Sequence, residues 1–115
     1  MIDAPDPQAL GLFYHQVLGW EIYRNEPNEF VLAVPGNSET YLAFQPQTSA
    51  PWAPPVWPAA EGQQQMMMHL DIEVGDLETA VEHAVELGAT LAEFQPQANV
   101  RVLFDPAGHP FCLYS

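Results

Sequence analysis

The chain repeats one pattern of a helix and strands twice, and this repeat constrains the fold more than any other feature. Each half predicts a capped amphipathic helix, which Asp6 with Pro7 opens and Gly19 closes in the first half, and which Asp76 opens and Gly88 closes in the second. From Asp to Gly is thirteen residues in one copy and twelve in the other. This match indicates an internal duplication with a period near seventy residues.

Three strands are predicted after each helix, with turn-forming residues between them. They cover residues 20–25, 30–34 and 40–45 in the first half, and residues 89–94, 100–104 and 111–114 in the second. The clearest strand, Met67–Val74, precedes the second helix. Only Met1–Pro5 precedes the first helix, so we expect the first strand to be truncated. The prediction is an α+β fold of two tandem βαβββ units that form a half-barrel.

The two units are expected to form a single domain over residues 1–115, because 12.8 kDa is too little for two independent cores. The units are predicted at residues 1–45 and 66–115. Residues 46–65 hold five prolines together with Trp52 and Trp57, and they are interpreted as an irregular crossover. The two tryptophans either plug the barrel mouth or stack on a ligand or a second subunit.

The charge of the chain excludes two classes of partner. Fifteen Asp and Glu stand against two Arg and no Lys, a formal net charge of −13. Nucleic acids and anionic membranes are disfavoured, because both need clustered basic residues. The single cysteine, Cys112, favours a reducing compartment, and no apolar run is long enough for a signal peptide or membrane span, so a cytoplasmic protein is expected.

The strand Met67–Val74 carries most of the ionisable chemistry. Alternation along a strand puts His69, Asp71 and Glu73 on one face. The same alternation turns Gln45 on its strand, and Cys112 and Tyr114 on the last strand, away from the apolar face. If these faces converge, they form one concave acidic surface, although a solvated sheet face would give the same pattern.

The doubled unit and three motifs resemble a known superfamily. The motifs are His-Leu-Asp-Ile-Glu-Val-Gly-Asp-Leu from His69, Leu-Gly-Ala after the second helix, and Asp-Pro-Ala-Gly-His before the last strand. They are similar to the glyoxalase, bleomycin-resistance and extradiol dioxygenase group, the vicinal oxygen chelate superfamily. The Pro-Pro-Val-Trp-Pro segment and the Gln run look like its glyoxalase-like domain branch. The likeness covers nearly the whole chain from Asp6.

This resemblance implies a place for a metal. Metal enzymes of the group take one ligand from the first and one from the last strand of each unit, usually His or Gln and then Glu. His69 falls in one such position, whereas Gln45 and Cys112 stand where Glu is expected. The fourth position, seven residues before Asp6, lies upstream of Met1. The implied ligand set is therefore a degenerate one of His69, Gln45 and Cys112.

A second ligand set is open from the residues themselves. His69 and Asp71 are two residues apart on one strand, close enough to share an ion, and His109 is a conceivable third ligand. His109 stands in a turn, where His is also favoured for conformational reasons.

Two functions from different classes follow. In the first, the protein is a homodimeric binding module without a cofactor that holds a small cationic or aromatic molecule through His69, Asp71, Glu73, Gln45, Tyr114, Trp52 and Trp57. In the second, it is a metal-dependent lyase, isomerase or dioxygenase that uses Zn, Fe, Mn or Ni at His69, with Glu73 moving the proton. An orphan domain that only pairs with another protein is the third interpretation.

Overall fold

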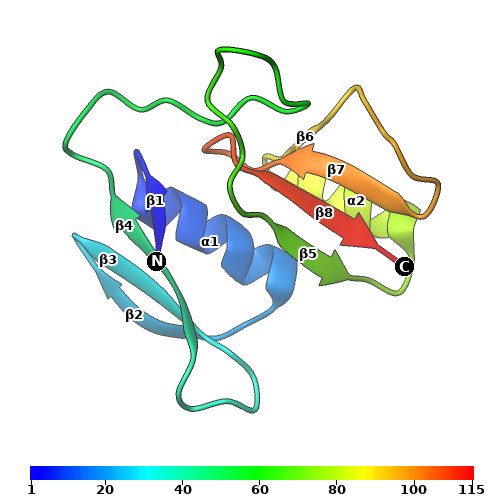
Figure 1. The fold of residues 1–115 in the computed structure, drawn as a ribbon. Helices are drawn as coiled ribbons and strands as arrows, with labels where there is room; N and C mark the ends of the chain where they lie inside the picture. Colours follow the sequence, from blue (N-terminus) through cyan, green and yellow to red (C-terminus); the bar gives the residue numbers. More distant parts are fainter. The chain divides into compact units, whose positions relative to one another are not determined.

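Each half of the chain forms one helix and one four-stranded sheet. The computed structural model describes residues 1–115 and divides them into two units, Met1–Trp52 and Ala53–Ser115 (Figure 1). The first unit contains β1 (Ile2–Ala4), α1 (Pro7–Leu18), β2 (Ile22–Glu26), β3 (Glu29–Ala33) and β4 (Tyr41–Pro46). The second contains β5 (Leu70–Glu73), α2 (Leu77–Glu86), β6 (Thr90–Leu91), β7 (Val100–Phe104) and β8 (Pro110–Tyr114).

The two sheets have the same topology. Their strand orders are β1-β4-β3-β2 and β5-β8-β7-β6, so the opening strand of each unit lies at an edge beside the last strand. That pairing is parallel in both sheets, and the other pairings are antiparallel. The predicted α+β fold of two tandem βαβββ units is therefore confirmed. The short first strand is three residues long and pairs with β4.

Side-chain caps start both helices where the sequence predicts. The carboxylate of Asp6 accepts the N–H of Ala9 at 3.0 Å, and that of Asp76 accepts the N–H of Thr79 at 2.9 Å. These bonds satisfy donors that the first turn of a helix leaves unpaired. Gly19 closes α1 with a φ of 72°, which glycine adopts without steric cost. Neither helix has the length and apolar run that crossing a membrane requires.

Aromatic packing fills the core of the first unit. The rings of Tyr14 and Phe44 stack with centroids 5.6 Å apart, and Phe30 meets Phe44 edge-on at 6.4 Å. All three side chains are fully buried. Gly11 on α1 allows this close approach, because an ideal Cβ there would lie 2.1 Å from Cδ1 of Phe30. Helix α1 thus rests directly on β3, with which it makes many contacts.

In the second unit, α2 lies along one face of the sheet (Figure 1). Leu103, Phe111 and Leu113 are buried on the strands that α2 contacts. Alternation along β8 turns Cys112 and Tyr114 to the opposite face, and both are partly exposed there. The apolar face of this sheet is therefore used for packing, which leaves the polar face available for a ligand.

Two predicted strands are wrong in their extent. The strand predicted over Met67–Val74 pairs only over Leu70–Glu73, because its partner β8 begins at Pro110. The strand predicted over residues 89–94 is confined to Thr90–Leu91. Beyond it, the side chain of Gln95 bonds to the backbone N–H and carbonyl of Val102, so a side-chain amide replaces the backbone pairing.

Replacing Gly11 with alanine is expected to destabilise the protein, because the added Cβ would overlap the buried ring of Phe30 at a cost of about 1–3 kcal/mol. Alanine regains about 1 kcal/mol in a helix interior, so we expect a net loss of up to about 2 kcal/mol. Urea unfolding measures the change. Gly75→Ala is the matched control, since nothing lies within 4 Å of its Cβ position. A Gly11→Ala variant as stable as the wild type would refute the tight contact.

Candidate functional site

A pocket of about 430 Å³ opens on the second unit. Its size falls in the range of small-molecule sites in proteins. Apolar and aromatic side chains make up most of its lining, together with a small polar group. The residues that line it are Trp57, Met66, His69, Asp71, Pro96, Gln97, Val100, Val102, Pro110, Cys112 and Tyr114.

The strand register explains how residues far apart in sequence reach this pocket. Asp71 on β5 lies opposite Cys112 on β8, which in turn lies opposite Val102 on β7. Residues paired in this way point to the same face of a sheet. Tyr114 and Val100 form the next such row. The pocket therefore has a floor of backbone-paired strands, whereas Trp57, Met66 and Pro96 reach it from irregular segments.

Three ionisable side chains meet in the pocket. Nε2 of His69 lies 3.1 Å from Oδ1 of Asp71. One donor atom from each of His69, Asp71 and Cys112 lies within 4.8 Å of the others. Burial raises the pKa of the Cys112 thiol to about 11, and the charge of Asp71 and its hydrogen bond to the thiol add to this effect. At neutral pH Cys112 is thus a protonated thiol beside the contact between His69 and Asp71.

Of the other residues predicted for the site, Trp57 lines the pocket, whereas Glu73, Gln45 and Trp52 do not. Glu73 shares the polar face of β5 and lies opposite Tyr114, but it does not line the pocket. Trp57 does line it, and its ring lies 5.7 Å from that of Phe94. Gln45 and Trp52 belong to the first unit, whereas every residue that lines the pocket belongs to the second. The amide of Gln45 donates to Oδ1 of Asp3 at 2.7 Å.

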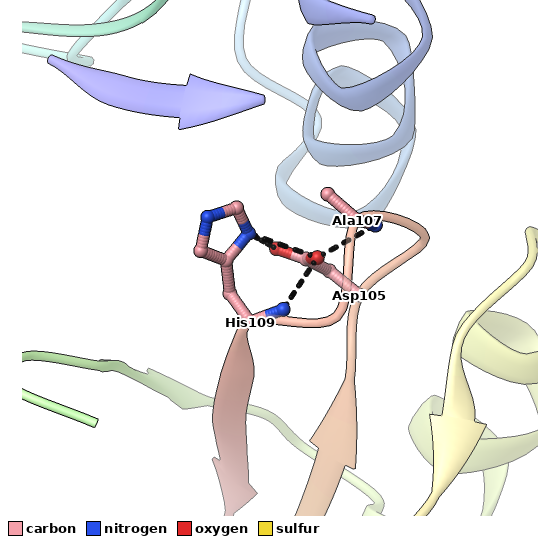
Figure 2. Close-up of polar contacts among 3 residues, drawn as sticks. All are labelled: Asp105, Ala107 and His109. Atoms are coloured by element: carbon pink, nitrogen blue, oxygen red, sulfur yellow. Dashed lines mark hydrogen bonds and ion pairs between the residues drawn. The ribbon is translucent and has the colours of Figure 1, made fainter. Parts of the chain in front are cut away.

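His109 is held by the turn before β8. The carboxylate of Asp105, only 4% exposed, accepts the backbone N–H groups of Ala107 and His109 at 2.9 and 3.0 Å. Nδ1 of His109 lies 2.9 Å from Oδ2 of the same carboxylate (Figure 2). The imidazole therefore points its Nδ1 at Asp105, and His109 does not line the pocket with His69. The contact with Asp105 holds the ring of His109 against the turn before β8.

Sequence reasoning missed the apolar half of the pocket. Val100 and Val102 lie on one face of β7, opposite Tyr114 and Cys112 of β8. The alternation that placed Cys112 and Tyr114 on the polar face of their strand would also have placed the two valines, if it had been applied to β7. Met66, Pro96 and Gln97 lie in irregular segments, where no periodicity marks them. Their positions depend on the folded loops.

The three clustered residues suit some divalent ions and not others. A thiolate and an imidazole are ligands that Zn²⁺ accepts, whereas Mg²⁺, Ca²⁺ and Mn²⁺ prefer oxygen. Ligand atoms around a tetrahedral Zn²⁺ are about 3.3–3.8 Å apart, given bond lengths of about 2.0–2.3 Å. The donor atoms of His69, Asp71 and Cys112 lie within 4.8 Å of one another, about 1 Å above this spacing. The donor types therefore fit Zn²⁺.

The raised pKa of Cys112 predicts slow alkylation. A pKa of about 11 instead of 9.0 leaves about a hundredfold less thiolate at pH 8. Since a more basic thiolate is also more nucleophilic, we expect iodoacetamide to react on the order of tenfold more slowly with the folded chain than with the urea-unfolded chain. Mass spectrometry follows the reaction at the single cysteine.

Asp71→Asn separates the effect of charge from that of burial. Without the carboxylate, the pKa of Cys112 falls and alkylation accelerates, although the thiol stays as buried as before. Glu82→Gln removes the same charge from the exposed side of α2 and should leave the rate unchanged. Equal rates in the Asp71→Asn and wild-type proteins would contradict this origin of the raised pKa.

Comparison with solved structures finds the same fold in several proteins. A glyoxalase/bleomycin resistance protein/dioxygenase family enzyme from Burkholderia phytofirmans PsJN matches with a TM-score of 0.68 and 19% identity over 97% of this chain and 91% of that one. A glyoxalase family protein from Enterococcus faecalis matches with a TM-score of 0.65 and 25% identity over 99% and 92%. The fosfomycin resistance protein FosX from Mesorhizobium loti matches with a TM-score of 0.64 and 12% identity over 99% and 86%.

The sequence itself matches a protein family. A search of the curated proteins found no match to this chain. The profile of the family described as "Glyoxalase-like domain", however, matches residues 1–114, nearly the whole chain. The fold, the duplicated units and this match agree with the resemblance in the His69 and Asp-Pro-Ala-Gly-His motifs. The chain therefore belongs to the Glyoxalase-like domain family, within the vicinal oxygen chelate superfamily of glyoxalases, bleomycin-resistance proteins and dioxygenases.

Proposed function

We propose that this protein is a binding module that holds a small cationic molecule with an aromatic or apolar part in the pocket of the second unit. The pocket's lining carries the proposal: one carboxylate, Asp71, stands in an otherwise mostly apolar wall that includes Trp57 and Tyr114. Neither Lys nor Arg lines this wall. A cation that reaches Asp71 also gains contact with aromatic faces, which attract cations.

The charge of the whole chain supports the same choice of ligand. A net charge of −13 raises the local concentration of cations around the protein and repels anions. Most of the carboxylates lie on the surface, as Glu78, Glu82 and Glu86 do on α2. They attract a cation without fixing its place. Asp71 supplies the fixed contact, because β5 is paired to β8 at that residue.

Thioflavin T, a planar aromatic cation, tests this proposal by isothermal titration calorimetry. We expect it to bind once per chain and to bind up to about fivefold more weakly to Asp71→Asn, since an ion pair with an exposed carboxylate contributes about 0.2–1 kcal/mol. Glu82→Gln, with the same loss of charge on α2, should bind as the wild type does. The anionic dye anilinonaphthalene sulfonate should bind more weakly than thioflavin T. Absence of thioflavin T binding, or equal affinity of the wild type and Asp71→Asn for the dye, would refute the proposal.

A second candidate function is a metal-dependent lyase, isomerase or dioxygenase. The meeting of His69, Asp71 and Cys112 within 4.8 Å favours it, because these residues would hold a divalent ion. Such an ion supplies Lewis-acid chemistry to a substrate that chelates it. Tyr114 and Trp57 would orient the substrate in the pocket. Glu73, on the same face of β5, stays the predicted proton carrier.

Elemental analysis of protein purified without a chelator tests the second candidate. A resident ion is expected at close to one per chain, and its removal should lower the melting temperature because the ion binds the folded state alone. Less than about a tenth of an ion per chain, with no change in melting temperature on adding metal, would reject it.

A homodimer and a cytoplasmic location complete the proposal. Met67 and Met68 are 86% and 87% exposed just before β5, and such apolar surface is suited to a second copy. The cytoplasmic location rests on the unpaired thiol of Cys112, which a reducing compartment preserves.

A further inference from the structure

The wall of the pocket that carries Trp57 belongs to a segment with little buried surface. Residues 53–65 contain no helix and no strand beyond one isolated bridge, and Pro55 and Trp57 are half-buried whereas the rest are exposed. A segment without a core of its own keeps its place through individual contacts. We call residues 53–66 the strap, because Trp57 and Met66 of this segment both line the pocket.

The strap closes on itself beside the pocket. The backbone N–H of Val56 donates to the carbonyl of Gln64 at 2.8 Å, and Val56 pairs with Gln65 in a parallel bridge. The residues that directly follow the bridge on its two sides are Trp57 and Met66. Because the paired segments run in the same direction about 4.8 Å apart, these two residues are neighbours. Displacing the strap therefore displaces both of them together.

Pro54 anchors the strap to the turn before β8. An ideal Cβ on Gly108 would lie 2.6 Å from Cβ and 3.2 Å from Cγ of Pro54. A glycine is needed for this approach, since carbon atoms in contact are about 3.5–4.0 Å apart. Gly108 also has a φ of 97°, in the left-handed region that other residues adopt only with strain. The ring of Pro54 is therefore seated directly on the backbone of the turn.

The turn that carries Gly108 is the Asp-Pro-Ala-Gly-His motif, and its own hydrogen bonds hold it rigid. The buried carboxylate of Asp105 accepts the N–H groups of Ala107 and His109, on either side of Gly108 (Figure 2). The N–H of Gly108 itself donates to the carbonyl of Asp105 at 2.9 Å. Strand β8 begins directly after the turn. The turn is thus fixed to the sheet that forms the pocket floor, and it gives the strap a rigid support.

Proline stiffens the chain between this support and the pocket. The rings of Pro54 and Pro55 fix the φ angles of both residues, and Trp57 follows only two residues later. The amide of Gln64 donates to the carbonyl of Ala53 at 2.6 Å, which ties the far side of the strap to the same point. A displacement at Pro54 is therefore passed on to Trp57 rather than absorbed between them.

We propose that Gly108 is a positioning residue for the pocket: its backbone seats Pro54, this contact fixes the strap, and the strap sets the place of Trp57 against the guest. A larger residue at this position must push Pro54 away by about 1 Å to restore an ordinary contact between carbon atoms. A shift of about 1 Å is enough to loosen a binding site. The effect on the guest rests on the proposed function, whereas the effect on Trp57 does not.

Fluorine NMR of the full chain labelled with 5-fluorotryptophan reports the place of Trp57 without a ligand. The chain has three tryptophans, and Trp57→Phe assigns the resonance of Trp57. We expect Gly108→Ala to shift this resonance by more than its linewidth and to leave that of Trp20 in place. Pro54→Gly, which removes the seated ring and adds no strain at Gly108, should also shift it. In the Pro54→Gly background, Gly108→Ala should then cause no further shift.

Titration with thioflavin T measures the consequence for the guest. We expect Gly108→Ala to bind the dye at least about threefold more weakly than the wild type, because contact with an aromatic wall is loosened. Gly19→Ala is the matched control, since Gly19 also has a positive φ, 72°, but nothing lies within 4 Å of its Cβ position. It should lower the melting temperature through the same kind of strain, yet leave the dye affinity and the Trp57 resonance unchanged.

The outcomes separate this inference from the proposed function. A Trp57 resonance that stays in place in Gly108→Ala or in Pro54→Gly, or that Gly108→Ala shifts equally in both backgrounds, would overturn the positioning role. Equal dye affinity of Gly108→Ala and the wild type would overturn the effect on the guest. A wild type that does not bind the dye, with a Trp57 resonance that shifts as expected, would refute the binding module and retain the positioning role of Gly108.

Discussion

The parallel pairing of β5 with β8 is the interaction on which the pocket depends. These strands are separated by α2, β6 and β7 along the chain, yet their pairing sets Asp71 beside Cys112 and Glu73 beside Tyr114. A parallel pair needs a crossover of this kind, and α2 provides it while covering the apolar face of the sheet. A shift of register by one residue would turn Asp71 and Cys112 to opposite faces. The contact of Asp71 with Cys112 thus follows from the strand register, which the buried side chains of Phe111 and Leu113 hold in place.

The first unit repeats this pairing with different chemistry. Asp3 lies opposite Gln45, as Asp71 lies opposite Cys112. There the amide of Gln45 donates to the carboxylate at 2.7 Å, which satisfies both groups. In the second unit the partner is a thiol, a much weaker hydrogen-bond donor, and the carboxylate also lies beside an imidazole. Equivalent positions therefore hold an amide and a carboxylate in the first unit, and a thiol and a carboxylate beside an imidazole in the second.

Much of the fold could be predicted from the sequence because local signals agreed with each other. The caps at Asp6 and Asp76, the apolar spacing and the repeat all indicated the same two units. The prediction failed where tertiary contacts decide the outcome. Pairing of the strand predicted from Met67 starts only at Leu70, because Pro110 opens its partner strand, and Gln95 ends β6 with side-chain bonds that no periodicity encodes.

The candidate site was predictable only as far as alternation along strands extends. His69, Asp71, Cys112 and Tyr114 reach one pocket because each belongs to, or directly precedes, a paired strand. His109 shows the limit of this reasoning. It was a conceivable metal ligand by residue type, yet it does not line the pocket with His69, and Asp105 holds its ring within the turn. A histidine in sequence is only a candidate ligand, and the partner that its ring finds in the fold decides its use.

The thiol of Cys112 bears on the ligand that we propose for the pocket. The superfamily resemblance implies Glu at this position, a residue that would be charged at neutral pH. A protonated thiol there removes one negative charge and leaves Asp71 as the carboxylate of the pocket. One remaining carboxylate matches the single positive charge of the guest in the proposed function. The thiol is accommodated without any change in the strand pairing that supports the pocket.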